Sequence, residues 1–420
     1  MKISGRVLRE DAIEQIKKIG ETDILVGVPS YRNAETIGHV IETAGAGLMR
    51  YFPNLRAVIV NSDGSPDTET RAAAAAAPID PSICRVVTEY QGLPGKGSAF
   101  HTIFRIADRL GANTVILLDS DLRSITPEWI KLLGEPIHKY SYGFVAPLYT
   151  RHKFDGTITN AIAYPLMCAL YGRSIRQPIG GEFGLSGGLA KILSHQDIWQ
   201  SDVARFGIDI WLTTTAVCEG FSLCQADMGV KLHDEKDPGT DLGPMFKQVV
   251  GTIFELMRKY RVKWQFVDAC RMAERVGKHP SGTPEPVLVD HVRLFGRFQE
   301  VFNEYESFYS DIMGADSLPE LKHLTVEMDS ETLLFPDRLW ARAVYDHAVA
   351  YHHAGAGERD DILGSLMALY LGRTAAFVRQ ARDLSDLEVE ELIADGAEAF
   401  AAEKPYLVER WVSKTATLTA

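Results

Sequence analysis

The chain has 420 residues, of which 46% are hydrophobic and 24% are charged, values typical of a soluble globular protein rather than of a disordered or fibrous one. This length exceeds the needs of one ordinary domain, so we expect two. The net charge of -12 argues against a general affinity for nucleic acid, although a local basic pocket for phosphates is compatible with it. We therefore predict no nucleic-acid partner.

The N-terminus and the cysteines indicate a cytoplasmic protein. The first residues, Met1-Lys-Ile-Ser-Gly-Arg6, have no apolar segment typical of a secretory signal. No uninterrupted apolar run is long enough to span a bilayer, so we predict no membrane association. The five cysteines are scattered and odd in number, a pattern that predicts reduced thiols rather than a disulfide framework.

Strand and helix patterns alternate along the first part of the chain. Expected strands lie at 24–28, 55–60, 84–88 and 114–118, with helices expected at 34–49, around the alanine run 72–77 and at 98–110. This alternation predicts an α/β fold with a mostly parallel sheet flanked by helices. In such sheets ligands bind beyond the carboxyl ends of the strands.

Two carboxylates follow the strand expected at 114–118. Asp119 and Asp121 are two residues apart, so in an extended chain their side chains point the same way. Two hard oxygen donors suit Mg²⁺ or Mn²⁺ held together with substrate phosphates. The alternative interpretation is an N-terminal cap for a helix beginning at Pro127, because Asp is favoured at such caps.

Two further strand ends carry polar residues. Asp63 follows the second expected strand and is suited to accept hydrogen bonds from a base or a ribose, although an Asx turn before Gly64 is an equally ordinary use. Lys96 stands between Gly95 and Gly97 just before a helix, where backbone N–H groups and the ammonium favour a phosphate. No P-loop and no Gly-x-Gly-x-x-Gly pattern is present.

The next stretch contains a basic cluster, several glycines and two more candidate residues. Arg151, His152 and Lys153 follow a strand expected at 144–148, and they are either an anion site or a solvated loop. The glycines near residue 180 indicate either close backbone approach to a ligand or a tight connection. Asp209 opens an apolar helix, where a cap is the alternative, and His233 ends a late strand, where it is either a surface residue or a metal ligand.

The last part of the chain is helical. Apolar residues from 246 to 257 keep helical spacing, and further helices are expected near 287–306, 331–352, 358–382 and 386–402. The proline-rich stretch 279–286 is the clearest linker. We predict a domain at 1–243 and a helical C-terminal domain at 244–420, the latter serving packing or dimerisation, and we expect a homodimer.

Taken together, the strand ends resemble a known family. The segments occur in the order found in GT-A fold nucleotide-sugar glycosyltransferases, and the set is similar to the retaining group that makes mannosylglycerate, glucosylglycerate and glucosyl-3-phosphoglycerate. The resemblance covers about residues 22–240. It is carried by Pro29-Ser-Tyr-Arg-Asn-Ala-Glu35, Asn61-Ser-Asp63, Gly95-Lys-Gly97, Asp119-Ser-Asp121, Gly180-Gly-Glu182, Gly207-Ile-Asp209 and His233.

The resemblance implies a role for each of these positions. Asp121 and His233 would hold a divalent metal, and Asp119 and Asp209 would act on the donor sugar. The acceptor's carboxylate would be held by Arg151 and Thr159, with the Ile179-Gly180 backbone lining its pocket. Residues implied to bind the donor are Pro29, Tyr31, Asn61, Asp63, Lys96, Asp119, Ser120, Glu182 and Asp209.

The function that the resemblance implies is a metal-dependent, retaining transfer of glucose or mannose from a GDP- or UDP-hexose to D-glycerate or 3-phosphoglycerate, as in compatible-solute synthesis. His152 and Lys153 are suited to accommodate the added phosphate of the second acceptor. Two other classes stay open, a sugar-phosphate nucleotidyltransferase and a non-catalytic nucleotide-sugar-binding protein. No carboxylate pair is placed as a nucleophile plus an acid/base, which fits a front-face displacement.

Overall fold

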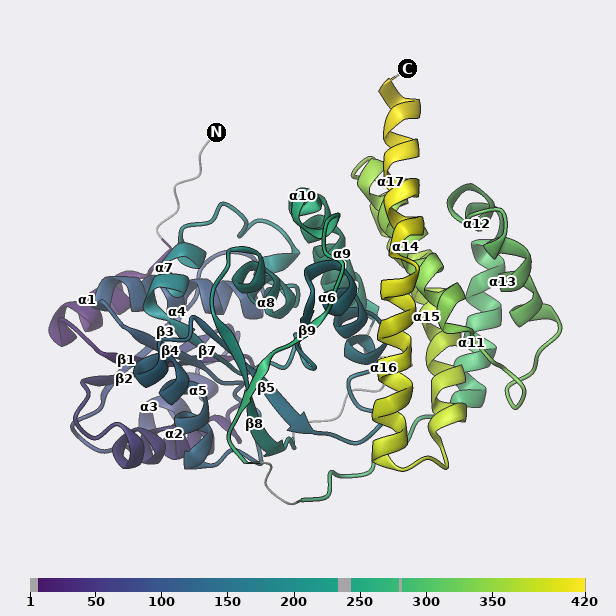
Figure 1. Cartoon of the computed structure of the whole chain (residues 1–420). Helices are drawn as coiled ribbons and strands as arrows, with labels where there is room; N and C mark the ends of the chain where they lie inside the picture. The colour runs from purple at the N-terminus through teal and green to yellow at the C-terminus, as the bar shows by residue number, and fades with distance from the viewer. Residues whose placement is uncertain (1–6, 233–242, 279–281, 420) are drawn as a thin grey trace. The chain divides into compact units, whose positions relative to one another are not determined.

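The computed structural model describes residues 7–232, 243–278 and 282–419, and the chain divides into two compact units (Figure 1). Unit 1 consists of Met1–Arg151, Arg176–Asp234 and Ala273–Glu285. Unit 2 consists of His152–Ile175, Glu235–Met272 and Pro286–Ala420. The chain therefore leaves unit 1 and returns to it twice.

Unit 1 is built on an eight-stranded sheet with the order β10-β8-β5-β7-β4-β1-β2-β3. β7 is antiparallel to both of its neighbours, and every other pairing in this sheet is parallel. The strands are β1 (Ile24–Ser30), β2 (Ala57–Asp63), β3 (Cys84–Glu89), β4 (Thr114–Leu117), β5 (Phe144–Thr150), β7 (Phe183–Ser186), β8 (Leu223–Val230) and β10 (Glu274–Val276). The predicted α/β fold is confirmed.

Helices cover both faces of this sheet. Ile24, Val26 and Val28 of β1 share one apolar cluster with residues of α2 and α5, because alternate side chains of a strand point to the same face. Gly27 points the other way, and a Cβ atom there would come within 2.5 Å of Ile103 in α4. The helices are α1 (Glu10–Ile19), α2 (Ile37–Tyr51), α3 (Glu69–Ala76), α4 (Lys96–Leu110), α5 (Pro127–Tyr140), α7 (Gly187–Ser194), the short η2 (Asp202–Ala204) and α8 (Ile208–Cys218).

The second strand differs from its prediction. The strand was expected to end at Val60, but β2 continues to Asp63, which pairs with Ser30 in β1 and with Glu89 in β3. Polar residues can extend this strand because the hydroxyl of Ser30 and the guanidinium of Arg71 satisfy the Asp63 carboxylate inside the fold. Hydropathy alone ends the strand too early.

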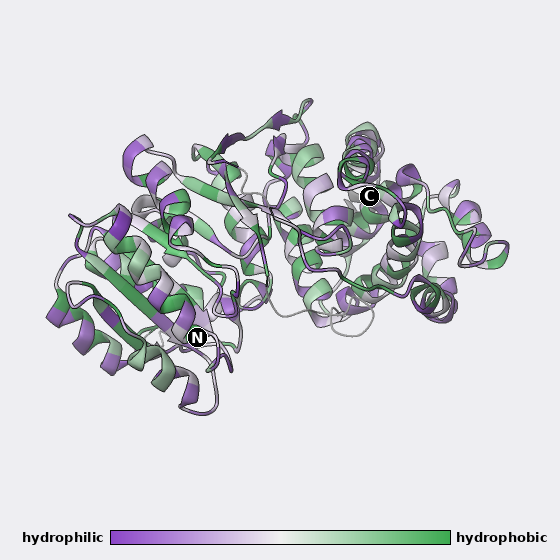
Figure 2. Ribbon diagram, turned by 90° about the horizontal axis from the view of Figure 1, so that it is seen from below, coloured by the Kyte–Doolittle hydropathy of each residue, from purple (hydrophilic) through white to green (hydrophobic). Residues whose placement is uncertain are grey.

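Unit 2 is helical, with one two-stranded pairing between β6 and β9. Its core is rich in large buried rings, including Trp340, Tyr345 and Tyr370. Figure 2 shows the mixed apolar and polar sides of its helices. The elements are η1 (Thr159–Ala163), α6 (Tyr164–Tyr171), β6 (Arg173–Ser174), α9 (Gly243–Lys259), α10 (Arg261–Trp264), β9 (Arg271–Met272), α11 (His291–Glu304), α12 (Glu306–Ile312), α13 (Ser317–Val326), α14 (Asp337–His353), α15 (Arg359–Ala381), α16 (Asp386–Ala402) and α17 (Lys404–Thr419).

Helix α15 is long and apolar enough to cross a membrane by length and composition alone. In the structure, 89% of its apolar window is buried inside the protein. It packs along α11 and also contacts α14 and α9. Its apolar character is therefore explained by its place as the core helix of unit 2.

Candidate functional site

The candidate residues of unit 1 gather at one edge of the sheet. β1, β2, β4, β5 and β8 run parallel, so their carboxyl ends lie on the same side. Leu117 at the end of β4 pairs with Phe183, which places Glu182, the residue before the antiparallel β7, at that edge too. β1 lies between β2 and β4, so the strand order reverses direction at β1. Sheets of this kind bind ligands at such a switch point.

Lys96 joins two carboxylates from distant parts of the chain. Its ammonium nitrogen lies 2.7 Å from Oδ1 of Asp119 and 3.2 Å from Oδ2 of Asp209. Lys96 opens α4, Asp119 follows β4, and Asp209 lies in the first turn of α8. The cap of α8 is Gly207, so the side chain of Asp209 is used for this ion pair and not as a helix cap.

A second lysine extends the charged network. The ammonium of Lys231, which follows β8, lies 2.8 Å from Oε2 of Glu182 and 3.4 Å from Oδ2 of Asp119. It also donates a hydrogen bond to the carbonyl of Gly180 at 3.0 Å. The hydroxyl of Tyr149 donates to Oε2 of Glu182. Carboxylates and ammonium groups therefore alternate through the site, and we call Lys96, Asp119, Glu182, Asp209 and Lys231 the charged cluster.

Burial and charge shift the pKa values in the charged cluster in different directions. Burial raises the pKa of Glu182 to about 7, with the nearby Asp119 charge adding to the effect and Lys231 opposing it. Burial also raises the pKa of Asp209, against the opposing charge of Lys96. For Asp119, burial is outweighed by Lys96 and Lys231, which hold its pKa well below the ordinary value. Asp119 is therefore the firmly ionised member.

Burial lowers the pKa of Lys96, but the charges of Asp119 and Asp209 outweigh this effect and raise it above the ordinary value. Lys96 is therefore a permanent cation at the ligand edge of the sheet. Oδ1 of Asp209 is buried and has no hydrogen-bond partner among the residues that the structure describes. A buried carboxylate oxygen without a donor is a position that a ligand hydroxyl would satisfy.

Glycine is required where the backbone approaches these charges. Gly181 has φ +100, and a Cβ atom there would lie 2.4 Å from Oδ2 of Asp119. At Gly180 a Cβ atom would come within 2.2 Å of Pro147. The Gly180-Gly181 segment thus places the Gly180 carbonyl beside Lys231, which is a packing reason for the glycines.

The glycines around Lys96 are explained by packing as well. A Cβ atom at Gly97 would lie 1.8 Å from the carbonyl oxygen of Val203, and one at Gly95 would lie 2.6 Å from that of Ala204. The Gly97 N–H donates to the Arg205 carbonyl, and the Gly95 N–H donates to the Tyr90 hydroxyl. The N–H groups of Gly95 and Gly97 already donate hydrogen bonds within the protein. In this turn it is therefore the Lys96 ammonium that suits an anion.

Asp63 lies in a fully buried polar network. Its Oδ1 accepts hydrogen bonds at 2.8 Å from the hydroxyls of Ser30 and Ser65, and its Oδ2 pairs with Arg71 at 3.0 Å. Asn61 donates to the Val28 carbonyl and to Ser30, while its own Oδ1 is buried without a partner among the described residues. Neither residue forms the Asx turn that was the alternative for Asp63.

Three other predicted donor-binding residues lie near this edge. Pro29 is buried within β1, whereas the Tyr31 side chain just after the strand is exposed. The Ser120 hydroxyl donates to Oδ1 of Asn33, and the Ser120 carbonyl accepts from Thr36. These contacts fix the Asp119-Ser120-Asp121 turn against the loop after β1.

Asp121 stands apart from the ion pairs. It is half-buried, and in the described part of the chain its carboxylate has no hydrogen bond or ion pair. The cap of α5 is Thr126, so the alternative role of Asp121 as that helix's cap is wrong. His233 lies outside the described residues. Among the residues that are described, no three His, Cys, Asp or Glu side chains gather as a metal site.

The predicted acceptor residues fall in different units. Arg151, in unit 1, donates to the Gly180 carbonyl at 3.3 Å, and its guanidinium lies 5.3 Å from the centre of the Tyr149 ring. Ile179 and Gly180 belong to the same unit. Thr159 begins the π-helical turn η1 of unit 2 and is buried there. Arg151, Ile179 and Gly180 are thus brought together.

Lys153 is not available for a phosphate. Its ammonium donates to three carbonyls at the end of α15 and just after it, at 2.7 Å to Ala381, 2.8 Å to Arg382 and 2.9 Å to Leu384. A lysine is favoured there because the last carbonyls of a helix have no internal donors. The prediction that Lys153 accommodates the phosphate of 3-phosphoglycerate is therefore wrong.

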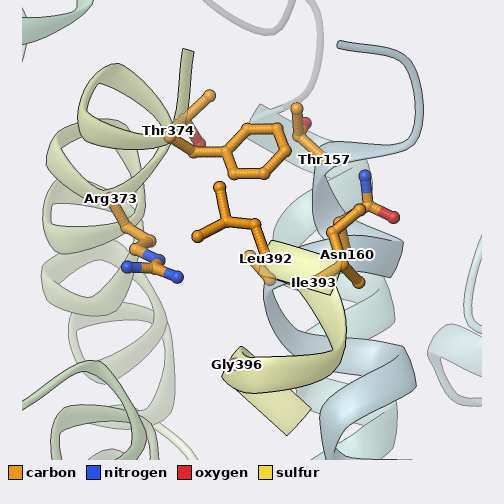
Figure 3. A pocket seen from close by; sticks show the side chains of 9 residues that line it. Thr157, Asn160, Arg373, Thr374, Leu392, Ile393 and Gly396 are labelled. Atoms are coloured by element: carbon orange, nitrogen blue, oxygen red, sulfur yellow. The ribbon is translucent and has the colours of Figure 1, made fainter. Parts of the chain in front are cut away.

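The turn that carries Thr159 also borders a pocket inside unit 2 (Figure 3). Its cavity volume is about 20 Å³, so the pocket is small. Side chains from three segments converge on it, the turn around Asn160, α15 and α16. Arg373 lines it, but its guanidinium is bound to the Phe335 carbonyl and to Asp337. The pocket is therefore mainly apolar in character, with its cation already paired.

Two members of the site escaped the sequence analysis. Lys231 and Tyr149 lie at the ends of β8 and β5, and both are buried. The sequence feature that could have indicated Lys231 is its position directly after an apolar strand. Tyr149 stands beside the basic residues that begin at Arg151, and the local sequence indicates only a basic loop there. Its hydrogen bond to Glu182 depends on the fold.

Comparisons with known proteins found a family model that matches part of the chain. Residues 25–184 match the family model described as glycosyl transferase family 2. No curated protein matches the chain. A solved structure of glucosyl-3-phosphoglycerate synthase from Mycobacterium tuberculosis, in complex with Mn²⁺, UDP and phosphoglyceric acid, is 23% identical, with 57% of this chain and 82% of that chain covered and a TM-score of 0.45.

A second solved structure, described as a mycobacterial protein, is 25% identical, with 60% of this chain and 80% of that chain covered and a TM-score of 0.43. The family match covers β1 to β4 and extends into β7, the part that carries Lys96, Asp119 and Glu182. Residues 25–184 are thus similar to family 2 glycosyl transferases, and this match indicates a glycosyltransferase.

Proposed function

We propose that the chain transfers a hexose, glucose or mannose, from a UDP- or GDP-sugar to D-glycerate or 3-phosphoglycerate, with retention at the anomeric carbon and with Mg²⁺ or Mn²⁺. The observation that carries the proposal is the Lys96 ammonium held between Asp119 and Asp209 at the ligand edge of the sheet. A fixed cation there suits a diphosphate, and the flanking carboxylates suit sugar or ribose hydroxyls.

The donor would be held by this cluster from two sides. Lys96 would stabilise the negative charge that develops on the departing diphosphate, because a preorganised cation needs no reorientation during the reaction. The buried Oδ1 of Asp209, which has no partner among the described residues, would accept a hydrogen bond from a hydroxyl of the donor sugar. Asp119 would contact the ribose or the sugar, and Asn61 and Asp63 lie at the neighbouring strand end for the nucleotide.

One observation at Asp121 supports a divalent-metal site. Asp121 presents a carboxylate with no ion pair or hydrogen bond within the described residues, next to an edge where phosphates would bind. Asp121 would hold the ion together with His233, and hard oxygen donors of this kind suit Mg²⁺ or Mn²⁺. When bound, the ion would neutralise charge on the diphosphate leaving group.

The acceptor would be held by its carboxylate. Arg151 offers a planar pair of N–H donors, and its contact with the Gly180 carbonyl and the Tyr149 ring fixes its orientation. Thr159, which is buried in unit 2, stays a proposed acceptor-binding residue. Because Lys153 is committed to three carbonyls, a phosphate on the acceptor would need another partner, and this favours D-glycerate over 3-phosphoglycerate.

The transfer would proceed on one face of the sugar. The bond from the anomeric carbon to the diphosphate oxygen breaks, the acceptor hydroxyl oxygen bonds to that carbon from the same side, and the hydroxyl proton passes to the leaving phosphate. Asp119 and Asp209 are both ion-paired with Lys96. Their engagement supports a mechanism without a carboxylate nucleophile.

The remaining parts of the proposal concern the whole chain. We propose a cytoplasmic homodimer, with the helical C-terminal part serving packing or dimerisation and not chemistry. Size-exclusion chromatography with light scattering of the full chain measures the oligomeric state, and a monomer at assay concentration would exclude the dimer.

The test is a panel of initial rates of nucleoside diphosphate release. UDP-glucose, UDP-mannose, GDP-glucose and GDP-mannose are each paired with D-glycerate, 3-phosphoglycerate or glycerol, with Mg²⁺, Mn²⁺ or EDTA. The proposal expects release with one or two donors, dependence on a carboxylate-bearing acceptor and loss of activity in EDTA. Release of pyrophosphate from a nucleoside triphosphate plus a sugar phosphate, with no nucleoside diphosphate released in the panel, would instead identify a nucleotidyltransferase.

A further inference from the structure

Two cysteines far apart in the sequence meet in unit 2. Cys168 lies near the end of α6, and Cys270 lies immediately before β9. Gly172 connects them: its N–H donates to the Cys168 carbonyl at 3.1 Å, and its carbonyl accepts from the Arg271 N–H at 3.0 Å. The cysteines are thus held on either side of one residue.

The backbone around Gly172 permits this close approach. Gly172 has φ +65, and a Cβ atom there would lie 2.8 Å from the Ala269 carbonyl oxygen, so only glycine fits. The parallel pairing of β6 with β9 sets Arg173 opposite Arg271, which places Cys270 beside the end of α6. Each thiol shifts the pKa of the other. Their proximity is therefore fixed by backbone pairing and not by side-chain rotamers alone.

The two thiols differ in exposure. Cys270 is exposed, and Cys168 is buried. The neighbouring Cys168 and the positive charge of Arg173 lower the pKa of Cys270 against the opposing effect of burial, whereas the neighbouring Cys270 and burial raise the pKa of Cys168. An accessible thiol that ionises readily, next to a second thiol, is the arrangement that forms a disulfide under oxidising conditions.

We propose that Cys168 and Cys270 form a reversible disulfide in response to a small-molecule disulfide. The Cys270 thiolate attacks one sulfur of the reagent, expels a thiolate and becomes a mixed disulfide. The Cys168 thiol loses its proton to solvent and attacks the Cys270 sulfur, expelling the second thiolate. One reagent disulfide is reduced to two thiols while the protein loses two hydrogen atoms. Under this proposal Cys168 and Cys270 differ from the expectation that all five cysteines are reduced thiols.

The position of the pair gives the disulfide a structural effect. Between Cys168 and Cys270 the chain leaves unit 2 at Ile175, passes through unit 1 and re-enters unit 2 at Glu235. The disulfide would close a loop of about 100 residues that carries Glu182, Asp209 and Lys231. Oxidation would thereby restrict the unfolded chain over the segment that supplies most of the charged cluster.

The experiment treats the full-length protein with oxidised glutathione and maps its peptides by mass spectrometry under non-reducing conditions. The proposal expects a peptide pair joined through Cys168 and Cys270, no glutathione retained on Cys270, and a thermal unfolding midpoint raised by about 5–10 °C and restored by dithiothreitol. The Cys168→Ser variant should keep glutathione on Cys270. The Cys84→Ser variant, at an exposed cysteine of unit 1, is the matched control and should form the same link.

Cys270→Ser is the second variant. It changes an exposed side chain, so the protein should fold without any change in core packing. It should show no link and no shift of the midpoint. Glutathione that stays on Cys270 of the unmodified sequence, with Cys168 remaining a free thiol, would overturn the proposal. So would a link from Cys270 to any other cysteine.

Discussion

Lys96 and Asp209 are separated by 113 residues in the sequence, yet Lys96 Nζ donates a hydrogen bond to Oδ2 of Asp209 at 3.2 Å. The same ammonium lies 2.7 Å from Asp119. Opening residues of two helices and the end of a strand therefore converge on one cation. Because Lys96 is the shared partner of both carboxylates, it is the residue on which the charge balance of the site depends.

Replacement of Lys96 by methionine should weaken nucleoside diphosphate binding by at least about 10-fold, since one charge-assisted contact is worth roughly 1.5–3 kcal/mol. Asp119 and Asp209 would lose their common cation, so the protein should also unfold at a lower temperature. Isothermal calorimetry with UDP and GDP measures the binding. Lys191→Met, at an exposed lysine of α7, is the control and should change neither quantity. Unchanged affinity in the Lys96 variant would remove it from the donor site.

Glu182→Gln should alter how stability depends on pH. The pKa of Glu182 is raised to about 7 from an ordinary 4.5, so its contribution to stability is complete below pH 4.5 and is lost as the pH rises through 7. Glutamine stays neutral, so the variant should gain up to about 3 kcal/mol relative to the unmodified protein between pH 4.5 and pH 8. Urea unfolding across this range measures the difference.

The matched control for this prediction is Glu69→Gln, an exposed position in α3, whose difference from the unmodified protein should stay flat over the same range. A flat difference for Glu182→Gln as well would mean that the buried carboxylate ionises normally.

Gly181→Ala should lower turnover by about 10-fold or more. The substitution requires an L residue at φ +100 and puts a methyl group 2.4 Å from Oδ2 of Asp119, so either the backbone or the carboxylate must move. Gly188→Ala in α7 has no atom closer than 4.0 Å to the added carbon and is the control. Initial rates of diphosphate release measure the effect, and full activity of Gly181→Ala would show that the Asp119 position tolerates displacement.

Arg151→Lys should raise the KM for the acceptor or lower kcat while donor affinity stays unchanged, because lysine cannot reproduce the planar two-donor fork. Initial rates at varied D-glycerate concentration test this. Arg50→Lys, at the exposed end of α2, is the control. Equal use of glycerol and glycerate by the unmodified protein would show that no carboxylate is recognised.

Asp121→Ala and His233→Ala should each remove most metal-dependent turnover. The Asp121 change should leave the unfolding temperature within about 1 °C of the original, because no contact within the described residues is lost. Asp197→Ala, an exposed carboxylate, is the control. Full activity in EDTA would contradict a metal requirement.

Local sequence patterns predicted the alternating strands and helices of unit 1 because each strand is a short apolar run followed by polar residues. They also located Lys96, Asp119 and Asp209, since charged residues directly after buried strands or at helix starts are conspicuous. They missed the antiparallel insertion of β7 between β4 and β5 and the extension of β2 to Asp63, because pairing partners lie far away in sequence.

The errors at Lys153 and Lys231 have the same physical origin. Both are lysines near strand ends, and hydropathy places both on the surface. In the fold, Lys153 donates to three carbonyls at and just after the end of α15, and Lys231 is ion-paired with the buried Glu182. Neither partner is visible locally, since α15 is more than 200 residues away from Lys153 and Glu182 is 49 residues away from Lys231. Local sequence patterns also could not predict that each unit is built from three separate segments of the chain.

The most direct test of the charged cluster as the donor site is transfer of labelled hexose to D-glycerate by the unmodified protein and by Asp209→Asn, with the best donor from the panel. Asparagine keeps the size of the side chain but removes the charge that pairs with Lys96. We predict a labelled hexosyl-glycerate from the unmodified protein and a rate at least about 100-fold lower from the variant, with a cooperative unfolding transition retained. Equal rates for the two proteins would contradict the assignment of this cluster as the donor site.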